Sequence, residues 1–434
     1  MSSAVTIMSR LKQSQLFKDS FWALVGSAIG KGLSLIAGIV VARLLGSEAY
    51  GEYGTIKNTL LMIAIFSSMG LGYSATKFIA ENLSANNLQR IIQTHRIATR
   101  ITLVVSGVIS ILVLVASNII AIWLEAPHLS PALRISAIAV IFNALNTTQT
   151  GELAGFGAYR KLAINNTWTG IFTFISSLIL TYYNGFYGAI IALTISLIFN
   201  AILNQRTIRS YLKQITPPCN IDRVYSKEII KFSLPIALQE SLYAITNWLS
   251  IYILIKFANY TELGLYSAAI QWMAVVLFIP GALRNVALSH FSSVNNDCTQ
   301  TDKILKRLML VNFISTFVPF IVICIMSGWI ESVYGVSFNG LQEVLNICVF
   351  TAIISSLTNV LTQEFISQGQ NWFLFISRLI RDITILILLC CAVSTYSGGA
   401  LLCATISLFG QSLYLFLLLI KYHHIRNVQQ NSIP

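Results

Sequence analysis

A stretch near the amino terminus, Arg43–Tyr53, has a degenerate copy a little over 200 residues later in the chain. The copy keeps the spacing of a basic residue, a glycine and a tyrosine, and further pairs follow at nearly the same offset. The matched positions are Arg43 with Lys256, Gly51 with Gly264, Tyr53 with Tyr266, Glu152 with Glu364, Gly157 with Gly369, and Thr194–Leu197 with Thr405–Leu408. The chain therefore contains two tandem copies of one unit. In a membrane protein such a duplication is typical of a transporter whose halves alternate around a shared cavity.

The apolar runs are too many and too long for a soluble domain. Apolar residues make up 55% of the 434 residues, and charged residues only 10%. A bilayer span needs roughly 20 mostly apolar residues, and a helix satisfies its own backbone in lipid. We therefore predict an all-α polytopic membrane protein with 12 transmembrane helices. The spans are 21–45, 54–79, 97–123, 133–156, 163–183, 186–208, 229–256, 264–290, 309–330, 342–366, 372–395 and 398–421.

These spans predict two six-helix bundles, residues 1–208 and 229–434, joined by a cytoplasmic linker at 209–228. Two mixed segments, 80–100 and 291–308, are expected to form short interfacial helices. Nineteen lysine and arginine residues fall in the loops on one side, against two on the other. The positive-inside rule then places both termini in the cytoplasm. The net charge of +12 follows from this topology, so we expect no binding to nucleic acid.

A motif after the first span carries a family resemblance, Arg43-x-Leu45-Gly46-x-x-x-Tyr50-Gly51-x-Tyr53. It is supported by Pro235 early in the seventh span and by the stretch Gly155-x-Gly157-x-x-Arg160 after the fourth. With these features the chain resembles, end to end, the polysaccharide-biosynthesis flippases of the multidrug/oligosaccharidyl-lipid/polysaccharide (MOP) exporter superfamily.

The resemblance implies two bundles related by a pseudo-twofold axis and forming a V around a central cavity. It implies a polyprenyl-pyrophosphate-linked oligosaccharide as cargo, such as an O-antigen or capsule repeat unit. The cargo would be flipped from the cytoplasmic to the periplasmic leaflet of a bacterial inner membrane. Membrane lipids, a polysaccharide polymerase and a chain-length regulator are the candidate partners, and we expect a monomer. No metal or cofactor is expected, and coupling to a proton or a sodium ion is left open.

Lys31 is the first ionisable residue that the spans place deep in the membrane. It lies about ten residues into the first span, near 15 Å depth. Charges at this depth are costly and usually face a cavity or a partner. Two interpretations follow for Lys31: contact with the pyrophosphate or sugar of the cargo, or a structural ion pair with Glu240 in the seventh span.

The eleventh span carries three charges, Arg378, Arg381 and Asp382. Arg378 and Asp382 are spaced to pair on one helix face, which would leave Arg381 to point elsewhere. Arginine suits phosphate because its planar fork donates two parallel hydrogen bonds. The arginines are therefore candidate cargo ligands, with an internal ion-pair cluster as the alternative. Asp382 is also a candidate for ion coupling.

Three further charges lie toward the cytoplasmic ends of spans. Arg284 in the eighth span either faces the cavity or extends to the interface. Glu152 and Glu364 coincide in the repeat, which predicts a shared structural role, such as capping the neighbouring link or pairing with Arg160. A role in a gate is the alternative.

Three functions compete for such a chain. A flippase for an anionic lipid-linked oligosaccharide needs a net-positive cavity, which the mid-depth charges predict. An ion-coupled multidrug or cation antiporter of the same superfamily needs a dominant acidic residue, for which Glu240 is the candidate. A polymerase or ligase needs a catalytic outer loop, and no nucleophile–base pattern or Gly-rich phosphate loop is present. We therefore expect a flippase and not an enzyme.

Overall fold

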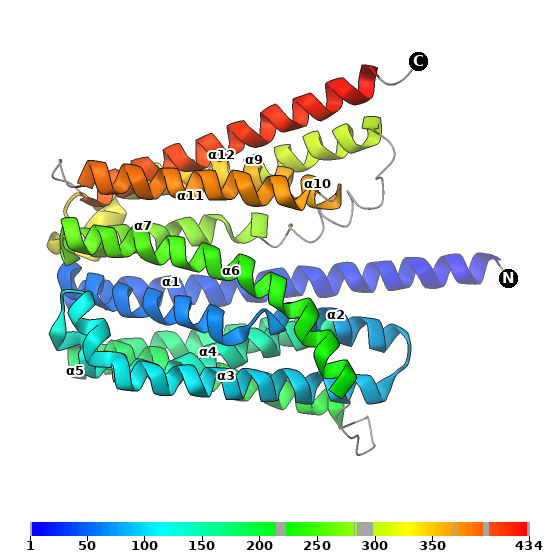
Figure 1. Ribbon diagram of the computed structural model, residues 1–434, viewed down its shortest axis with the longest axis horizontal. Coiled ribbons are helices and arrows are strands. Elements are labelled where there is room, and N and C mark those ends of the chain that lie inside the picture. Colours follow the sequence, from blue (N-terminus) through cyan, green and yellow to red (C-terminus); the bar gives the residue numbers. More distant parts are fainter. Residues whose placement is uncertain are drawn as a thin grey trace. The chain divides into compact units, whose positions relative to one another are not determined.

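The structure is a computed structural model that describes residues 2–213, 223–281, 283, 298–368, 370–393 and 399–431 (Figure 1). Every regular element in these residues is helical. The elements are α1 Ser2–Ser68, α2 Leu71–Ser84, α3 Leu88–Trp123, η1 Pro127–Leu129, α4 Ser130–Gly155, α5 Tyr159–Leu212, α6 Arg223–Phe257, α7 Tyr260–Val276, α9 Cys298–Tyr334, η2 Val336–Phe338, α10 Leu341–Ser367, α11 Asn371–Val393 and α12 Gly399–Asn431.

Seven helical segments among the described residues are long and apolar enough to cross a membrane. One covers 41 residues of α1 and another all 54 residues of α5, far more than the roughly 20 residues that one crossing needs. The all-helical membrane fold is therefore confirmed. The arrangement of twelve spans in two six-helix bundles remains a prediction.

Both of these long helices contain a glycine with non-helical backbone. Gly46 (φ 79°, ψ 170°) interrupts α1, and Gly185 (φ 53°, ψ −132°) interrupts α5. Positive φ is readily adopted by glycine because it has no Cβ. The two breaks fall between the predicted first and second spans and between the predicted fifth and sixth. Each long helix is thus two helices joined by a glycine turn.

The predicted second span, 54–79, is not one continuous helix, because the chain breaks before its carboxyl-terminal part. Helix α1 ends at Ser68, and α2 begins at Leu71 after two residues with positive φ, Met69 and Gly70. Gly70 also packs closely: a Cβ there would lie 3.0 Å from the Ser233 carbonyl oxygen of α6. The close approach of a neighbouring helix therefore coincides with the break.

The interfacial segments differ from the prediction as well. Residues 88–100 are the start of α3, which continues without a break to Trp123. Asn87 caps this helix by accepting a hydrogen bond from the Arg90 backbone N–H. Residues 298–308 likewise belong to α9, while 291–297 lie outside the described residues. Both segments extend long helices beyond their apolar stretches.

The described contacts divide the chain into two compact units. The first unit contains residues 1–44 and 53–248, and the second contains residues 45–52 and 249–434. These bounds differ from the predicted bundles, because α6 up to Trp248 belongs to the first unit. The reason is side-chain contact: Trp248 Nε1 donates to Thr59 Oγ1 at 3.0 Å, and Ser74 and Ser233 hydroxyls lie 2.6 Å apart.

In the first unit, α4 packs against α2, α3 and α5, which run side by side with it (Figure 1). Small residues allow the helices to approach closely, as is common in membranes. A Cβ on Gly151 of α4 would lie 2.0 Å from the Gly72 carbonyl oxygen of α2. Thr76 supports the same crossing by donating to the Gly151 carbonyl at 2.9 Å.

In the second unit, α10 is the central helix and packs against α7, α9 and α12. Its most apolar stretch is 67% buried, the largest share among the seven candidate spans. The buried residues Val360, Leu361 and Phe365 of α10 form a core with residues of α9, α11 and α12. This core surrounds the polar network described below.

The two glycines of the repeated motif pack on each other within the second unit. A Cβ on Gly264 would lie 2.0 Å from the Ser47 carbonyl oxygen and 3.3 Å from the Gly51 nitrogen. Beside this crossing, the buried Tyr50 donates to Gln271 Oε1 at 2.8 Å and stacks edge-on against Phe338. The motif thus closes the turn after Gly46 onto α7, and its residues serve helix packing.

Candidate functional site

Two of the predicted site residues, Lys31 and Glu240, lie on helices of the first unit. Lys31 on α1 is exposed. Glu240 on α6 is half-buried and accepts a hydrogen bond from the Tyr73 hydroxyl of α2 at 3.5 Å. The structure therefore brings Glu240 together with a residue that the sequence did not single out. A direct contact between Lys31 and Glu240 remains a prediction.

Lys57 is a second lysine on α1 of the first unit. Its place near the start of the predicted second span, 54–79, is typical of an interfacial anchor. In the structure the helix resumes directly after Gly46. Measured from Gly46 at 1.5 Å per residue, Lys57 lies about 16 Å along this segment. Its side chain is half-buried.

The charges of α11 are arranged differently from the predicted i, i+4 pair. Asp382 pairs with its neighbour Arg381, whose Nε and terminal nitrogen lie 2.7 and 2.6 Å from Asp382 Oδ1. Both side chains are buried, and the Arg381 guanidinium also lies 5.2 Å from the centre of the Tyr414 ring. The predicted Arg378–Asp382 pair is therefore wrong. Arg381 and Asp382 neutralise each other inside the second unit.

Arg378 lies one turn before this pair and is half-buried. It forms no ion pair with any residue that the structure describes. Arg284 lies outside the described residues, so its cavity role remains a prediction. Of the two arginines predicted on α11 to bind cargo, Arg378 is thus the one whose charge is not already balanced by Asp382.

Glu152 on α4 is fully buried and meets His95 of α3. His95 Nδ1 lies 2.7 Å from Glu152 Oε2. The other carboxylate oxygen, Oε1, is buried without a hydrogen-bond partner in the described residues. The predicted partner Arg160 is instead exposed at the start of α5. The pairing of Glu152 with Arg160 is therefore wrong.

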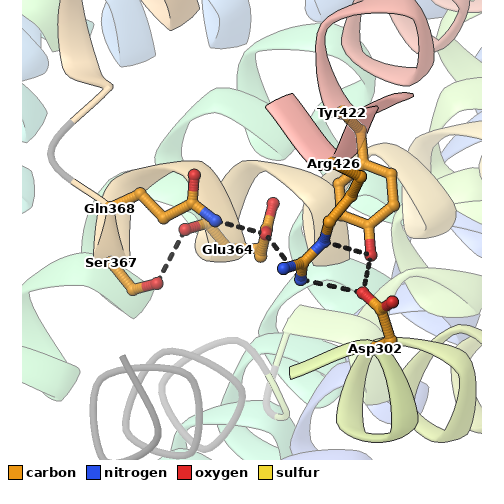
Figure 2. A network of polar contacts seen from close by, with 6 residues as sticks. All are labelled: Asp302, Glu364, Ser367, Gln368, Tyr422 and Arg426. Carbon is orange, nitrogen blue, oxygen red and sulfur yellow. Dashed lines mark hydrogen bonds and ion pairs between the residues drawn. The ribbon is translucent and has the colours of Figure 1, made fainter. Parts of the chain in front are cut away.

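Glu364 on α10 occupies the equivalent place in the second unit and has a richer set of donors (Figure 2). Gln368 Nε2 donates to Glu364 Oε1 at 2.6 Å, one helical turn farther along. A terminal nitrogen of Arg426 on α12 lies 3.9 Å from the same oxygen. Ser367 donates to the Glu364 backbone carbonyl at 2.7 Å. The contacts to Gln368 and Ser367 agree with a role at the link that follows α10.

Arg426 connects this carboxylate to α9. The same terminal nitrogen lies 2.8 Å from Asp302 Oδ1, and Arg426 Nε donates to the Tyr422 hydroxyl at 3.3 Å. The Tyr422 hydroxyl in turn donates to Asp302 (Figure 2). One guanidinium therefore joins two carboxylates and three helices, α9, α10 and α12.

The repeat thus predicted the two carboxylates but not their partners. His95 and Arg426 had no signal of their own, because each contacts its carboxylate from a helix distant in sequence. Asp302 joins the second site through Arg426 and Tyr422. Among the described residues, no group of three or more His, Cys, Asp or Glu side chains could hold a metal ion. The contacts found at these sites are hydrogen bonds and ion pairs.

Comparison with known proteins places these features in a family. A profile of the family described as polysaccharide biosynthesis protein matches residues 40–311, more than half of the chain. An uncharacterized membrane protein of Methanocaldococcus jannaschii is 24% identical over 243 residues, which are 52% of this chain and 56% of that protein. The match thus spans little more than half the length of this relative.

Two solved structures share the fold over nearly the whole chain. One is an inward-facing multidrug resistance MATE family transporter of the MOP superfamily, with a TM-score of 0.79 and 14% identity over 95% of this chain and 99% of that one. The other is a MOP superfamily transporter from Pyrococcus furiosus, whose binding pocket is described as having reverse polarity. Its TM-score is 0.70, with 15% identity over 95% and 96% of the two chains. The protein belongs to the polysaccharide biosynthesis protein family and has the fold of MOP superfamily transporters.

Proposed function

We propose that this protein is a flippase for a polyprenyl-pyrophosphate-linked oligosaccharide, such as an O-antigen or capsule repeat unit. The cargo moves from the cytoplasmic to the periplasmic leaflet of a bacterial inner membrane by alternating access. Both termini lie in the cytoplasm, and the protein acts as a monomer. A polymerase and a chain-length regulator take over the flipped unit.

The observation that carries this proposal is the pair of lysines, Lys31 and Lys57, within the apolar span Ala28–Ser68 of the first unit. A pyrophosphate has to leave water to cross the bilayer, and fixed cations along its path lower that cost. In the second unit Arg378 adds a third cation, while Arg381 and Asp382 cancel. Against these stands Glu240, so the described charges at depth keep a positive excess. Membership of the polysaccharide biosynthesis family supports the same cargo class.

An ion-coupled multidrug or cation antiporter is the second candidate, and one observation favours it. Glu240 is a half-buried carboxylate whose described hydrogen bond comes from Tyr73, and the fold is shared with a multidrug resistance transporter. A cationic drug would use Glu240 as its counter-charge. Lys31 and Lys57 would repel that drug, which is why the flippase is the better proposal.

The test is surface polysaccharide in a strain deleted for the gene, together with the sidedness of its lipid-linked oligosaccharide. We expect loss of the polymer, with single repeat units accumulating on the cytoplasmic leaflet. Units that still reach the periplasm would refute the flippase. Unchanged polysaccharide with altered drug sensitivity would establish the antiporter.

Charge variants then test the mechanism in the complemented strain, with membrane abundance measured in parallel. We expect Lys31→Ala and Lys57→Ala to lower polymer at normal abundance, and Lys31→Arg and Lys57→Arg to retain most of it. Glu240→Gln should leave flipping in place, whereas an antiporter would lose transport. Full polymer in the double alanine variant would refute the cationic path.

A further inference from the structure

One buried face of α4 carries a row of polar side chains at helical spacing, Asn146, Gln149 and Glu152. Their exposed fractions are 7%, 4% and 0%. Each side chain has one oxygen buried without a hydrogen-bond partner in the described residues. Buried polar atoms are nearly always hydrogen-bonded, so such a row requires an explanation.

The unsatisfied oxygens of Gln149 and Glu152 belong to side chains that are neighbours on the helix surface, three residues apart. The Gln149 amide nitrogen already donates to Gln205 Oε1 of α5 at 3.0 Å. Its remaining atom, Oε1, can only accept. An ionised Glu152 can only accept as well. Two adjacent acceptors buried without a donor cost the desolvation of both, about 1–3 kcal/mol each.

We propose that Glu152, together with His95, is a proton-binding site of this transporter. One proton on Glu152 Oε1 turns the carboxylate into a donor toward Gln149 Oε1 and satisfies both oxygens at once. His95 then donates its Nδ1 proton to Glu152 Oε2, across the 2.7 Å that separates them. In this arrangement the carboxyl is neutral and the imidazole is neutral.

Most titratable groups on the neighbouring helices are exposed. The exceptions include Lys57 of α1, which packs on α4 through Leu60, and Tyr211 of α5, both half-buried, and the buried Tyr225 of α6, whose hydroxyl contacts Thr94 beside His95. The remaining charged or histidine residues that α2, α3, η1, α4 and α5 contribute in the described part of the chain, apart from His95 and Glu152, are exposed. They are Lys77, Glu81, Arg90, Arg96, Arg100, Glu125, His128, Arg134, Arg160, Lys161, Arg206 and Arg209. Ala75, Thr76 and Ile79 of α2, which approach the neighbouring Gly155, are uncharged. His95 is therefore the group that exchanges protons with Glu152, and its 13% exposed side chain gives it access to the surface.

The equivalent carboxylate of the second unit shows why this site differs. Glu364 receives the Gln368 amide hydrogen bond and lies near the Arg426 guanidinium, both of which favour the ionised form, although its Oε2 is also buried without a hydrogen-bond partner in the described residues. Glu152 has one partner, an imidazole, and no guanidinium or amide donor in the described residues. The duplicated carboxylates therefore differ in the donors and the cation beside them.

The inference goes beyond the proposed cargo, because it names a proton as the bound ion whatever the transported molecule is. Infrared spectroscopy of the purified protein tests it, since a protonated carboxyl has a carbonyl stretching band separate from that of a carboxylate. We expect such a band at about pH 7 in the wild type and its loss in Glu152→Gln. The control Glu343→Gln, which replaces an exposed carboxylate of α10, should keep the band.

Two further variants keep the test decisive. Gln149→Leu removes the acceptor, so the band should move to the higher frequency of a carboxyl that donates no hydrogen bond. His95→Gln should keep the band and slow its disappearance when the solution is made alkaline. An ionised Glu152 at about pH 7, seen as an unchanged protonated-carboxyl band and a lost carboxylate band in Glu152→Gln, would overturn the proposal. It would mean an imidazolium–carboxylate pair, or glutamine amides turned to donate to Glu152.

Discussion

Replacing Gly264 by alanine should destabilise the second unit more than any ordinary surface substitution. The new Cβ would lie 2.0 Å from the Ser47 carbonyl oxygen and 3.3 Å from the Gly51 nitrogen. Both obstacles are backbone atoms, which cannot rotate away. Because carbon contacts normally lie at about 3.5–4.0 Å, the two helices must separate by more than about 1 Å.

The separation has two energetic consequences. Overpacking of this kind costs about 1–3 kcal/mol. It also pulls Tyr50 away from Gln271, whose hydrogen bond contributes about 1 kcal/mol. We therefore expect Gly264→Ala to lower the free energy of unfolding by about 2–4 kcal/mol, the sum of these two effects.

The assay is thermal unfolding of the purified protein in detergent, with the monodisperse fraction followed by size-exclusion chromatography. Gly107→Ala is the matched control, because its Cβ would meet nothing within 4 Å on α3. Alanine there should be neutral or stabilising, by up to about 1 kcal/mol from helix propensity. If Gly264→Ala melts at the wild-type temperature, the close crossing of Gly51 and Gly264 does not exist.

Three further perturbations follow from the described contacts. Arg426→Ala should lower the free energy of unfolding by about 3–5 kcal/mol, measured by thermal unfolding, because it leaves the buried Glu364 without its cation. Arg426→Lys keeps the charge and should lower it less, and equal losses in the two variants would refute the pairing. Gly46→Ala should lower the free energy of unfolding by about 1–3 kcal/mol in the same assay, because φ 79° with ψ 170° is a backbone conformation that alanine avoids. An unchanged stability would mean that the turn is not formed. Burial raises the pKa of Tyr225, so the stability that its neutral phenol contributes is present below about pH 10 and is lost as the pH rises further. Tyr225→Phe should remove that alkaline dependence in melting measured across pH, together with about 1 kcal/mol from its hydrogen bonds to Asn82 and Thr94.

The sequence predicted the helical membrane fold because apolar runs are local signals. The turns at Gly46 and Gly185 fall where the predicted spans meet. The break at Met69–Gly70 was missed although Ser67, Ser68 and Gly70 mark it, because the predicted span was drawn across the apolar residues on both sides. Its most direct sign in the structure is the Ser233 carbonyl, which approaches from a helix more than 160 positions away.

The candidate site was predictable only in part, for a similar reason. The duplication identified Glu152 and Glu364 without any knowledge of packing. Their partners could not be found, since spacing along one helix says nothing about the helix opposite. Spacing also misled at Asp382, where the adjacent Arg381 bends back to the carboxylate in place of Arg378.

The exchange of segments between the two units bears on how the chain is made. Residues 45–52 pack on α7, which leaves the ribosome some 200 residues later, and the first unit needs α6 up to Trp248. In a nascent chain released after the first repeat, the turn at Gly51 would therefore lack its contact with α7, and Ser74 would lack its contact with Ser233 of α6. Folding of the first repeat has to wait for synthesis of the second. A gene split at the linker should therefore yield protein only when both fragments are inserted in the same membrane at the same time.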